Sequence, residues 1–278
     1  MRARVLAATI VGAIAAPAAT AQASPPQGTL SGNVALVGDY RFRGLSQTYR
    51  QPAIQGGVEY ASATGGYAGA WGSNVSGNQF LNGGSLELDL YGGYRWTGGA
   101  GKVGLDLGVL YYWYPRARYN IDPGDRYNTA EAYIGGRYDQ LSVKYSYALT
   151  NLFGMKTSTI GGYCGIDADG TAATTNCLGT GASKASGYID LAATFNLALG
   201  ASLALHYGHQ SVRSYDRLAY ADYKVSLTRA FGGTTLGAAW VSTDADARFY
   251  RFAPTTAGSN ETENVARSAI VLTASRTF

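Results

Sequence analysis

Charged side chains occupy alternate positions in several segments of this chain, with apolar or aromatic side chains between them. In "DYRFRGLSQT", Asp39, Arg41 and Arg43 alternate with Tyr40 and Phe42. Successive side chains of an extended segment point to opposite faces, so one face here is charged and the other is aromatic. Rows of acidic and basic groups around a water-filled space set up a transverse field, which selects solutes by charge and dipole.

The charged positions that share this phase form the candidate site. They are Asp39, Arg41, Arg43, Glu59, Glu87, Asp89, Arg95, Asp106, Glu131, Arg137, Lys144, Asp190, Asp222 and Lys224. We predict that these side chains line a pore. The alternative is that they pair with one another and plug a narrow barrel, which gives stability without conduction.

Two other residue types could do chemistry. Cys164 and Cys177 share one long loop, and in an oxidising compartment we predict that they form a disulfide. A metal site is not expected, because two cysteines with no histidine nearby do not complete a tetrahedral set. His206 could lie beside Ser226 on a neighbouring strand, as in an outer-membrane lipid-modifying enzyme. No G-x-S-x-G motif supports that alternative, and we predict no enzymatic activity.

Period-2 alternation of apolar and polar residues recurs through the chain and predicts an all-β protein of about twelve strands. The expected strands span 30–43, 53–61, 66–74, 85–96, 102–114, 129–138, 141–149, 186–197, 201–210, 221–229, 234–242 and 267–278. The connections between them alternate between long and short, and the longest covers about 150–185. Long loops at one end and tight turns at the other are typical of a transmembrane antiparallel up-and-down β-barrel.

The opposite face of these strands carries no central charge, as a lipid-facing surface requires. The outward positions are Val34, Leu36, Val58, Leu88, Leu105, Ile134, Val143, Leu191, Leu205, Val225, Leu236 and Leu272. Aromatic residues near strand ends are expected to form girdles at the two membrane interfaces. These are Tyr40, Phe42, Trp113, Tyr147 and Tyr223 on the outer side, and Tyr67, Tyr94, Trp96 and Tyr138 on the periplasmic side.

The two ends of the chain carry export and assembly signals. Residues 1–23 have Arg2 and Arg4, a short apolar run and an Ala-Gln-Ala end, which predicts a cleaved signal peptide before a barrel over 24–278. The terminal Phe278 ends an amphipathic strand and resembles the signal read by bacterial barrel-assembly machinery. The expected location is therefore the bacterial outer membrane, reached with the help of periplasmic chaperones.

Composition limits the partners. The chain has 22 basic and 18 acidic residues, and this small, scattered excess excludes nucleic acid as an expected partner. The expected partners are outer-membrane lipid and small solutes. We expect no cofactor, and the oligomeric state is not predictable from the sequence.

Several motifs resemble one known family. "GDYRFRGLSQTYRQPAIQGGVEYA", "GGYAGAWGSNV" and "YADYKVSLTR" are similar to the TorF family of porin-like proteins, also catalogued as Gcw_chp, a proteobacterial family of unknown function. The resemblance implies a porin-like β-barrel and supplies no substrate or catalytic residues. The expected function is passive diffusion of small polar or charged solutes. A plugged structural barrel and a surface adhesin that uses the long loops remain alternatives.

Overall fold

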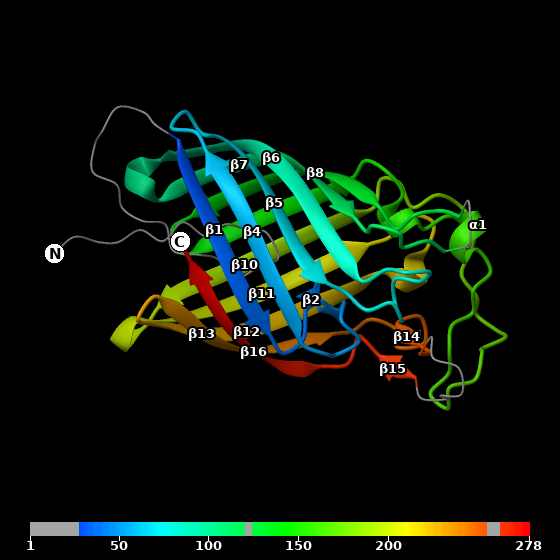
Figure 1. The fold of residues 1–278 in the computed structure, drawn as a ribbon. Coiled ribbons are helices and arrows are strands. Elements are labelled where there is room, and N and C mark those ends of the chain that lie inside the picture. The colour runs from blue at the N-terminus through cyan, green and yellow to red at the C-terminus, as the bar shows by residue number, and fades with distance from the viewer. Residues whose placement is uncertain (1–27, 120–123, 255–261) are drawn as a thin grey trace.

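Twelve long strands close into an antiparallel barrel in the computed structural model, which describes residues 28–119, 124–254 and 262–278 (Figure 1). The barrel strands are β1 (Thr29–Val37), β4 (Ala53–Ala61), β5 (Gly66–Asn74), β6 (Leu86–Gly98), β7 (Val103–Trp113), β8 (Thr129–Tyr138), β9 (Leu141–Ala148), β10 (Gly187–Asn196), β11 (Ala201–Ser211), β12 (Tyr220–Phe231), β13 (Thr234–Thr243) and β16 (Ala269–Thr277). Each pairs with its sequence neighbours among these twelve, and β1 pairs with β16 to close the ring. The predicted fold is confirmed. The predicted signal peptide lies outside the described residues.

The connections divide the barrel into two distinct ends. We call the end that carries the segments 38–52, 75–85, 114–128, 149–186, 212–219 and 244–268 the loop end, and the opposite end the turn end. At the turn end, β12 and β13 join through Gly232 and Gly233, both with positive φ (53° and 88°). A two-residue turn of this kind matches the twist of the flanking strands and favours glycine.

Cross-strand pairs show why neighbouring strands adopt this register. Between β6 and β7, Leu90 lies opposite Tyr111 on the outer face, and Arg95 lies opposite Asp106 on the inner face. Such apolar and oppositely charged pairs stabilise an antiparallel ladder. Slipping the register by one residue would turn the charges to the outside, so the two-faced pattern specifies a single alignment.

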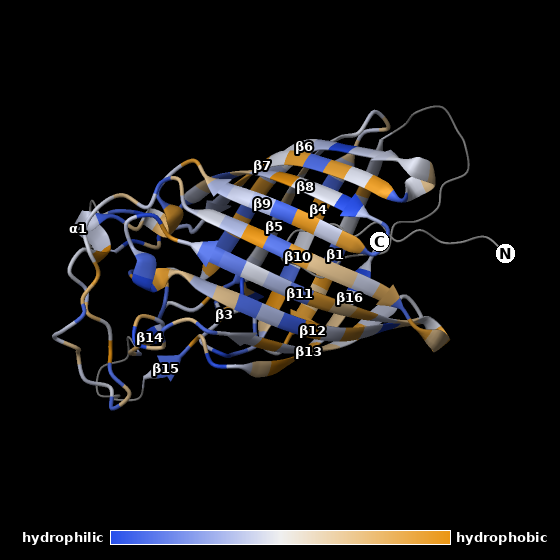
Figure 2. Ribbon diagram, turned by 180° about the vertical axis from the view of Figure 1, so that it is seen from behind, coloured by the Kyte–Doolittle hydropathy of each residue, from blue (hydrophilic) through white to orange (hydrophobic). Residues whose placement is uncertain are grey.

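The outer surface of the barrel is an apolar belt. Figure 2 shows the underlying alternation of hydrophobic (orange) and hydrophilic (blue) residues along the strands. The predicted outward residues are exposed, except that Leu88 is half-buried. Trp113, Tyr147 and Tyr223 are exposed near the loop end. Tyr94, Trp96 and Tyr138 are exposed near the turn end. The uncharged belt between these aromatic residues is the surface expected of a strand wall in lipid.

Short elements complete the structure. Two two-stranded pairs, β2 (Arg41–Phe42) with β3 (Leu45–Ser46) and β14 (Arg251–Phe252) with β15 (Glu263–Asn264), lie in the loop-end segments. The short helices are η1 (Gly99–Gly101), η2 (Leu152–Gly154), α1 (Thr157–Ile160), η3 (Ala198–Gly200) and η4 (Asp216–Leu218). Among the described residues, no helix is long and apolar enough to cross a membrane.

Candidate functional site: the barrel lumen

The chain leaves the barrel wall immediately after β1 and folds into the lumen. The Gly38 N–H donates to the Leu272 carbonyl at 2.9 Å, and the following residues turn inward. β2 and β3 then form a tight hairpin, which we call the lumenal hairpin (Arg41–Ser46). Its two turn residues, Arg43 and Gly44, both have positive φ (47° and 81°), as this class of two-residue turn requires.

This arrangement corrects the prediction for the opening segment. A strand over 30–43 was expected, with Tyr40 and Phe42 in lipid, whereas β1 ends at Val37 and both rings lie inside the barrel. Tyr40 packs edge-on against Trp71 at 5.5 Å, and Phe42 packs against Tyr112 at the same centroid distance. Alternation establishes that two faces differ, but not that the segment remains in the wall. Here the lumen itself has an aromatic lining that buries these rings.

Asp39 fixes the base of the lumenal hairpin. Its carboxylate accepts hydrogen bonds from Ser46 Oγ at 2.6 Å and Arg41 Nε at 2.7 Å. The Arg41 guanidinium also donates to the Gly44 and Arg267 carbonyls. Asp39 and Arg41 are therefore a buried, compensated pair, and neither charge faces open water.

Arg43, at the tip of the lumenal hairpin, contacts strands on the far wall of the barrel. Its guanidinium donates to Glu131 Oε2 on β8 and to Gln210 Oε1 on β11, both at 2.7 Å. It also lies 4.2 Å above the ring of Tyr188 on β10. The hairpin starts between β1 and β4 and ends against strands across the barrel, so it crosses the lumen.

Acidic side chains surround the place where the hairpin docks. Glu87, Asp89 and Glu131 point inward from β6 and β8 and are all buried. Tyr114 Oη donates to Glu87 at 3.0 Å, and Tyr112 Oη donates to Glu131 at 3.2 Å. These hydroxyls and Arg43 satisfy part of the acceptor capacity that burial demands.

The turn-end part of the same wall holds a second ionic cluster. Arg95 donates to both Glu59 oxygens, at 2.5 and 3.1 Å, and pairs with Asp106 at 3.4 Å. Tyr67 Oη donates to Asp106 and contacts the Tyr133 hydroxyl. Tyr67 was predicted in the periplasmic girdle, and this is wrong. It shares the inward phase of β5, and its ring lies 3.6 Å beneath the Arg95 guanidinium.

A histidine lies between two carboxylates on the opposite side. His206 on β11 contacts Asp190 at 3.3 Å through Nδ1 and Asp222 at 2.8 Å through Nε2. Ser226 lies opposite Ala204 rather than opposite His206. The imidazole is therefore engaged by acidic neighbours, and this geometry does not present a serine nucleophile with its base.

The remaining predicted lining residues also point inward. Lys144 lies 4.4 Å above the Tyr133 ring, and Arg137 donates to the Gly101 carbonyl at 2.8 Å. Lys224 lies opposite His206 and is exposed. All fourteen predicted residues thus point into the barrel or lie on the chain that enters it. Whether they line a path for solutes stays a prediction. Among the described residues, no group of three His, Cys, Asp or Glu side chains is arranged to hold a metal ion.

The two halves of the lumen differ in their access to water. In the loop-end half, every barrel strand contributes at least one buried inward side chain. Examples, one per strand, are Val37, Gln55, Trp71, Glu87, Tyr112, Glu131, Ser146, Tyr188, Gln210, Asp222, Val241 and Val271. In the turn-end half, the Arg95 cluster with Glu59, Asp106, Tyr67 and Tyr133 occupies the side formed by β4–β8. The inward side chains of β9–β13, β16 and β1 in this half are small and partly exposed, and include Ser31, Asn33, Ser142, Ala192, Ser202, Ser226, Thr228, Thr235 and Ser275. The lumenal hairpin, together with Phe80 and Phe153 of two other loops, thus fills the loop-end half, whereas part of the turn-end lining is accessible to water.

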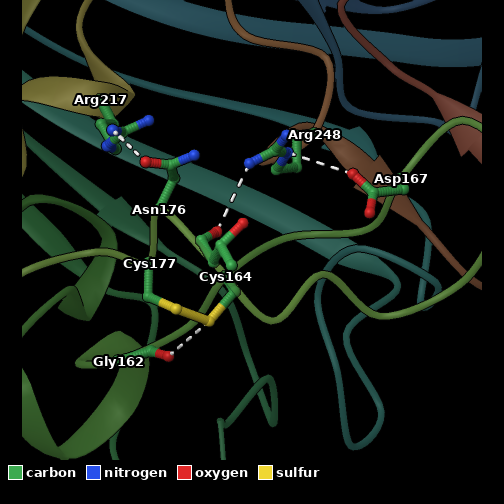
Figure 3. Close-up of a disulfide and its surroundings, with 8 residues drawn as sticks. Gly162, Cys164, Asp167, Asn176, Cys177, Arg217 and Arg248 are labelled. Atoms are coloured by element: carbon green, nitrogen blue, oxygen red, sulfur yellow. Dashed lines mark hydrogen bonds and ion pairs between the residues drawn. A yellow bond between two sulfur atoms is a disulfide. The ribbon is translucent and has the colours of Figure 1, made fainter.

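The loop-end segments pack together into a cap above the barrel. A second apolar cluster joins Leu152 and Leu178 of the longest loop to Val212, Leu218 and Phe249 of two others. The predicted disulfide, Cys164–Cys177, is present in this cap (Figure 3). The loop that carries the disulfide is tied to its neighbours through polar contacts. Arg248 pairs with Asp167 at 3.2 Å, and Arg217 donates to Asn176 at 3.3 Å.

Phe278 ends the chain at the turn end of the barrel. Its backbone exchanges two hydrogen bonds with Gly32 of β1, at 2.8 and 3.0 Å, so the last residue still belongs to the closing ladder. Its role as an assembly signal stays a prediction.

Comparison with solved structures finds other barrels of similar overall shape. The KdgM porin is 8% identical with a TM-score of 0.48, and the match covers 89% of this chain and 99% of that one. The NanC porin is 10% identical with a TM-score of 0.49, covering 90% and 99%. The COG4313 outer membrane channel from Pseudomonas putida F1 is 13% identical with a TM-score of 0.44, covering 92% and 97%. We draw no functional conclusion from likenesses at this level.

Sequence comparison is more decisive about ancestry. A search of curated proteins finds none that matches this chain. A family match, in contrast, runs from residue 19 to residue 278, which includes all the barrel strands, the lumenal hairpin and the cap. The chain belongs to the family described as "Bacterial protein of unknown function (Gcw_chp)".

Proposed function

We propose that this protein is an outer-membrane channel for small polar or charged solutes, narrowed by the lumenal hairpin. The apolar belt and the closed strand ring support placement in a bilayer, where an open sheet edge is not tolerated. In a bacterium, that placement corresponds to the outer membrane, with the loop end outside the cell. The export signal expected in residues 1–23 is consistent with this location.

One observation carries the channel proposal. In the turn-end half of the lumen, the side formed by β9–β13, β16 and β1 is lined by small side chains that are accessible to water, whereas the loop-end half has buried side chains around its whole circumference. The lumenal hairpin, six residues long and not part of the wall, packs with Phe80 and Phe153 of two other loops in this filling, and its tip reaches the far side through one arginine. A short hairpin held in this way can narrow a pore without being required for the barrel itself.

The plugged barrel is the competing function, and a specific observation favours it. Buried inward side chains occur on every barrel strand of the loop-end half, so the filling extends around the whole circumference. The channel proposal therefore requires that the hairpin moves or leaves a narrow path past its edge. We expect no catalytic activity in either case.

Conductance in planar bilayers separates the two functions. Folded wild-type protein should give small, frequently interrupted currents. Arg43→Ala removes the contacts with Glu131 and Gln210 and should raise the conductance or the open fraction. Arg229→Ala is the matched control, because this exposed arginine stacks on Phe231 and does not contact the hairpin.

A third variant makes the test decisive. Replacing residues 40–47 with a Gly/Ser linker removes the lumenal hairpin and should give the largest currents. Folding of each variant is checked by its heat-dependent shift on gels. Absence of current from folded wild-type protein, Arg43→Ala and the linker variant together would establish the plugged barrel and contradict the channel.

A further inference from the structure

A row of inward side chains crosses five neighbouring strands in the turn-end half of the lumen. Its members are cross-strand partners, and we call them the basic row: Arg137 on β8, Ser142 on β9, Ala192 on β10, His206 on β11 and Lys224 on β12. At about 4.8 Å between neighbouring strands, the row follows roughly 19 Å of the wall. It has a basic side chain at each end and contains no carboxylate.

The basic row holds the first inward charges on β11 and β12 when these strands are followed from the turn end. The inward residues between the row and that end are uncharged: Ser202 and Ala204 on β11, and Ser226, Thr228 and Ala230 on β12. The nearest carboxylates on this side, Asp190 and Asp222, lie one row nearer to the loop end. A solute that enters along these strands from the turn end therefore meets a basic side chain before an acidic one.

Lys224 is the most accessible of the basic side chains in this row. It is exposed, whereas Asp222 and Gly208 on its loop-end side and Val241 opposite it are buried. Its inward neighbour on the turn-end side is Ser226, which is small and partly exposed. The open space beside Lys224 therefore faces the turn end, and water reaches the side chain from there.

No carboxylate neutralises Lys224 by direct contact. Within the described part of the chain, no hydrogen bond or ion pair involves its ammonium group. Asp222 accepts from Tyr188 Oη at 2.9 Å and contacts His206 Nε2 at 2.8 Å. Asp190 contacts Nδ1 of the same imidazole at 3.3 Å. The two carboxylates nearest to the basic row are thus engaged with the histidine rather than with the lysine.

The charges on the opposite wall are paired or buried. Arg95 contacts both Glu59 and Asp106 in the turn-end half. Glu87 and Asp89 are buried in the loop-end half, at 0% and 3% exposure. Lys224 is therefore an exposed charge without an opposite partner. Inside a narrow lumen with low-dielectric walls, such a charge acts on solutes more strongly than it would in open water.

We propose that Lys224 contacts the solute and makes the lumen selective for small anions. Its ammonium group offers three donors to an anionic oxygen, and the small side chains of Ser226 and Ala204 leave room beside it. Arg137, at the other end of the row, donates to a backbone carbonyl, so its charge stays positive and adds to the same field. The inference names the solute class of the proposed channel and rests on that function, but the charge can be tested without current.

The test measures how fast one introduced thiol reacts with charged reagents in the folded protein in non-ionic detergent. Ser226→Cys places the thiol in the lumen, about 7 Å along β12 from Lys224. The native cysteines are joined in a disulfide and do not react. The reagents are the anionic sulfonatoethyl and the cationic trimethylammonioethyl methanethiosulfonate, and each rate is divided by that of the same reagent with a small free thiol. After this normalisation, the anionic reagent should react faster.

Lys224→Gln, added to Ser226→Cys, should remove this preference. Loss of one unit charge at this distance should change each rate by about 2.5-fold in opposite directions at low salt, so the ratio of the two rates should fall about sixfold. Lys224→Arg keeps the charge and should keep the ratio. Arg229→Gln is the matched control, because it removes a positive charge from the outer face of the same strand, and it should also keep the ratio. Folding of each variant is checked by its heat-dependent shift on gels.

Three results would overturn the inference: a preference of the Ser226→Cys protein for the cationic reagent, a ratio unaffected by Lys224→Gln, or a thiol that neither reagent reaches. Failure of the channel gives a different result. Folded protein that carries no current but loses its anionic preference with Lys224→Gln would contradict only the channel. Protein that conducts with an unchanged ratio would contradict only the anion preference. In a conducting protein, reversal potentials in a KCl gradient should favour chloride in the wild type and less so in Lys224→Gln.

Discussion

The loop-end and turn-end halves of the lumen are formed by the same twelve strands but hold different contents. In the loop-end half, inward side chains such as Glu131 and Tyr188 are buried against a segment of chain that left the wall after Val37. In the turn-end half, Ser226 and Thr228 also point inward, from β12, and remain partly exposed. The strands determine which side chains point inward, and the loop segments that enter the lumen determine whether these side chains meet protein or water.

This difference changes the cost of altering an inward residue. A change in the packed half creates a cavity or leaves a buried polar group without its partner, and both are expensive. Water can replace the lost contacts at the partly exposed inward positions of the turn-end half, where a change should alter solute passage more than stability.

The largest expected effect on stability comes from truncating the Tyr114 side chain. Its ring stacks on Phe80 at 4.4 Å, its hydroxyl donates to buried Glu87, and it is 1% exposed. Tyr114→Ala should lower the free energy of unfolding by about 3–5 kcal/mol, because it leaves both a cavity and an unpaired carboxyl oxygen. Urea unfolding in lipid vesicles measures the change. Thr228→Ala should stay within about 0.5 kcal/mol, and equal costs would contradict the division of the lumen.

The next effect concerns the contact across the lumen. Arg43→Ala leaves Glu131 buried without its ion-pair partner and should cost about 3 kcal/mol. This loss of stability should lie at the low end of the range for breaking a buried ion pair, because Tyr112 still donates to Glu131. Arg43→Met combined with Glu131→Leu should restore most of the stability, since neither charge remains to be buried.

The matched arginine in the turn-end half is partly exposed Arg137, which donates to the Gly101 carbonyl at 2.8 Å. Arg137→Ala should cost less than about 1 kcal/mol by the same unfolding measurement. If Arg43→Ala and Arg137→Ala have the same effect, the lumenal hairpin is not held by its tip.

A smaller effect on the stability of the barrel is expected when the disulfide of the cap is removed. Replacing Cys164 and Cys177 with serine opens a loop whose closure restricts the unfolded chain by about 3 kcal/mol in the entropy model. The loop contributes no strand to the barrel ladder, so the barrel transition should hardly move. Limited proteolysis should instead cut the cap faster. A large drop in the barrel melting temperature would mean that the cap and the barrel unfold together.

The strands and the lengths of their connections could be predicted from the sequence because alternation and turn residues are local signals. The lumenal hairpin could not, because Tyr40 and Phe42 keep the same alternation whether their segment stays in the wall or turns inward. A usable signal was present in Gly38, where the chain leaves the wall, and in Arg43-Gly44, a pair suited to a tight turn. Tyr67 was misplaced because its position near a strand end was weighed above its phase with Trp71.

The side-chain pairings within the candidate site also could not be predicted from the sequence. The phase of Arg43 predicts an inward direction, but its partners Glu131 and Gln210 are 88 and 167 residues away along the chain. These contacts depend on the barrel diameter and on the register of strands that the hairpin does not pair with. A strand register can be inferred from an apolar pattern, whereas the reach of one side chain across a lumen requires the closed structure.

The smallest expected effect is a pH dependence in the cap. Lys156 donates to Asp125 at 2.8 Å, and this contact, with help from Ser158, holds the pKa of the Asp125 carboxyl below its ordinary value of 3.8. Because the pKa is lower in the folded protein, the contribution is complete at neutral pH and is lost as the pH falls below about 4. Both side chains are about one-third exposed, so the contribution should be only a few tenths of a kcal/mol.

Hydrogen exchange over Thr157–Ile160, which follows Lys156, measures this local effect where global unfolding would miss it. Protection of these amides should fall modestly between about pH 6 and about pH 3, after correction for the intrinsic exchange rate. Asp125→Asn carries no charge to lose, so its amide protection should already be reduced at about pH 6 and should stay so at about pH 3. Ser146, buried in the packed half of the lumen, belongs to a strand whose protection should not change. A parallel loss along β9 would mean that acid loosens the barrel itself, and the titrating group would then have to lie among the buried carboxylates rather than in the cap.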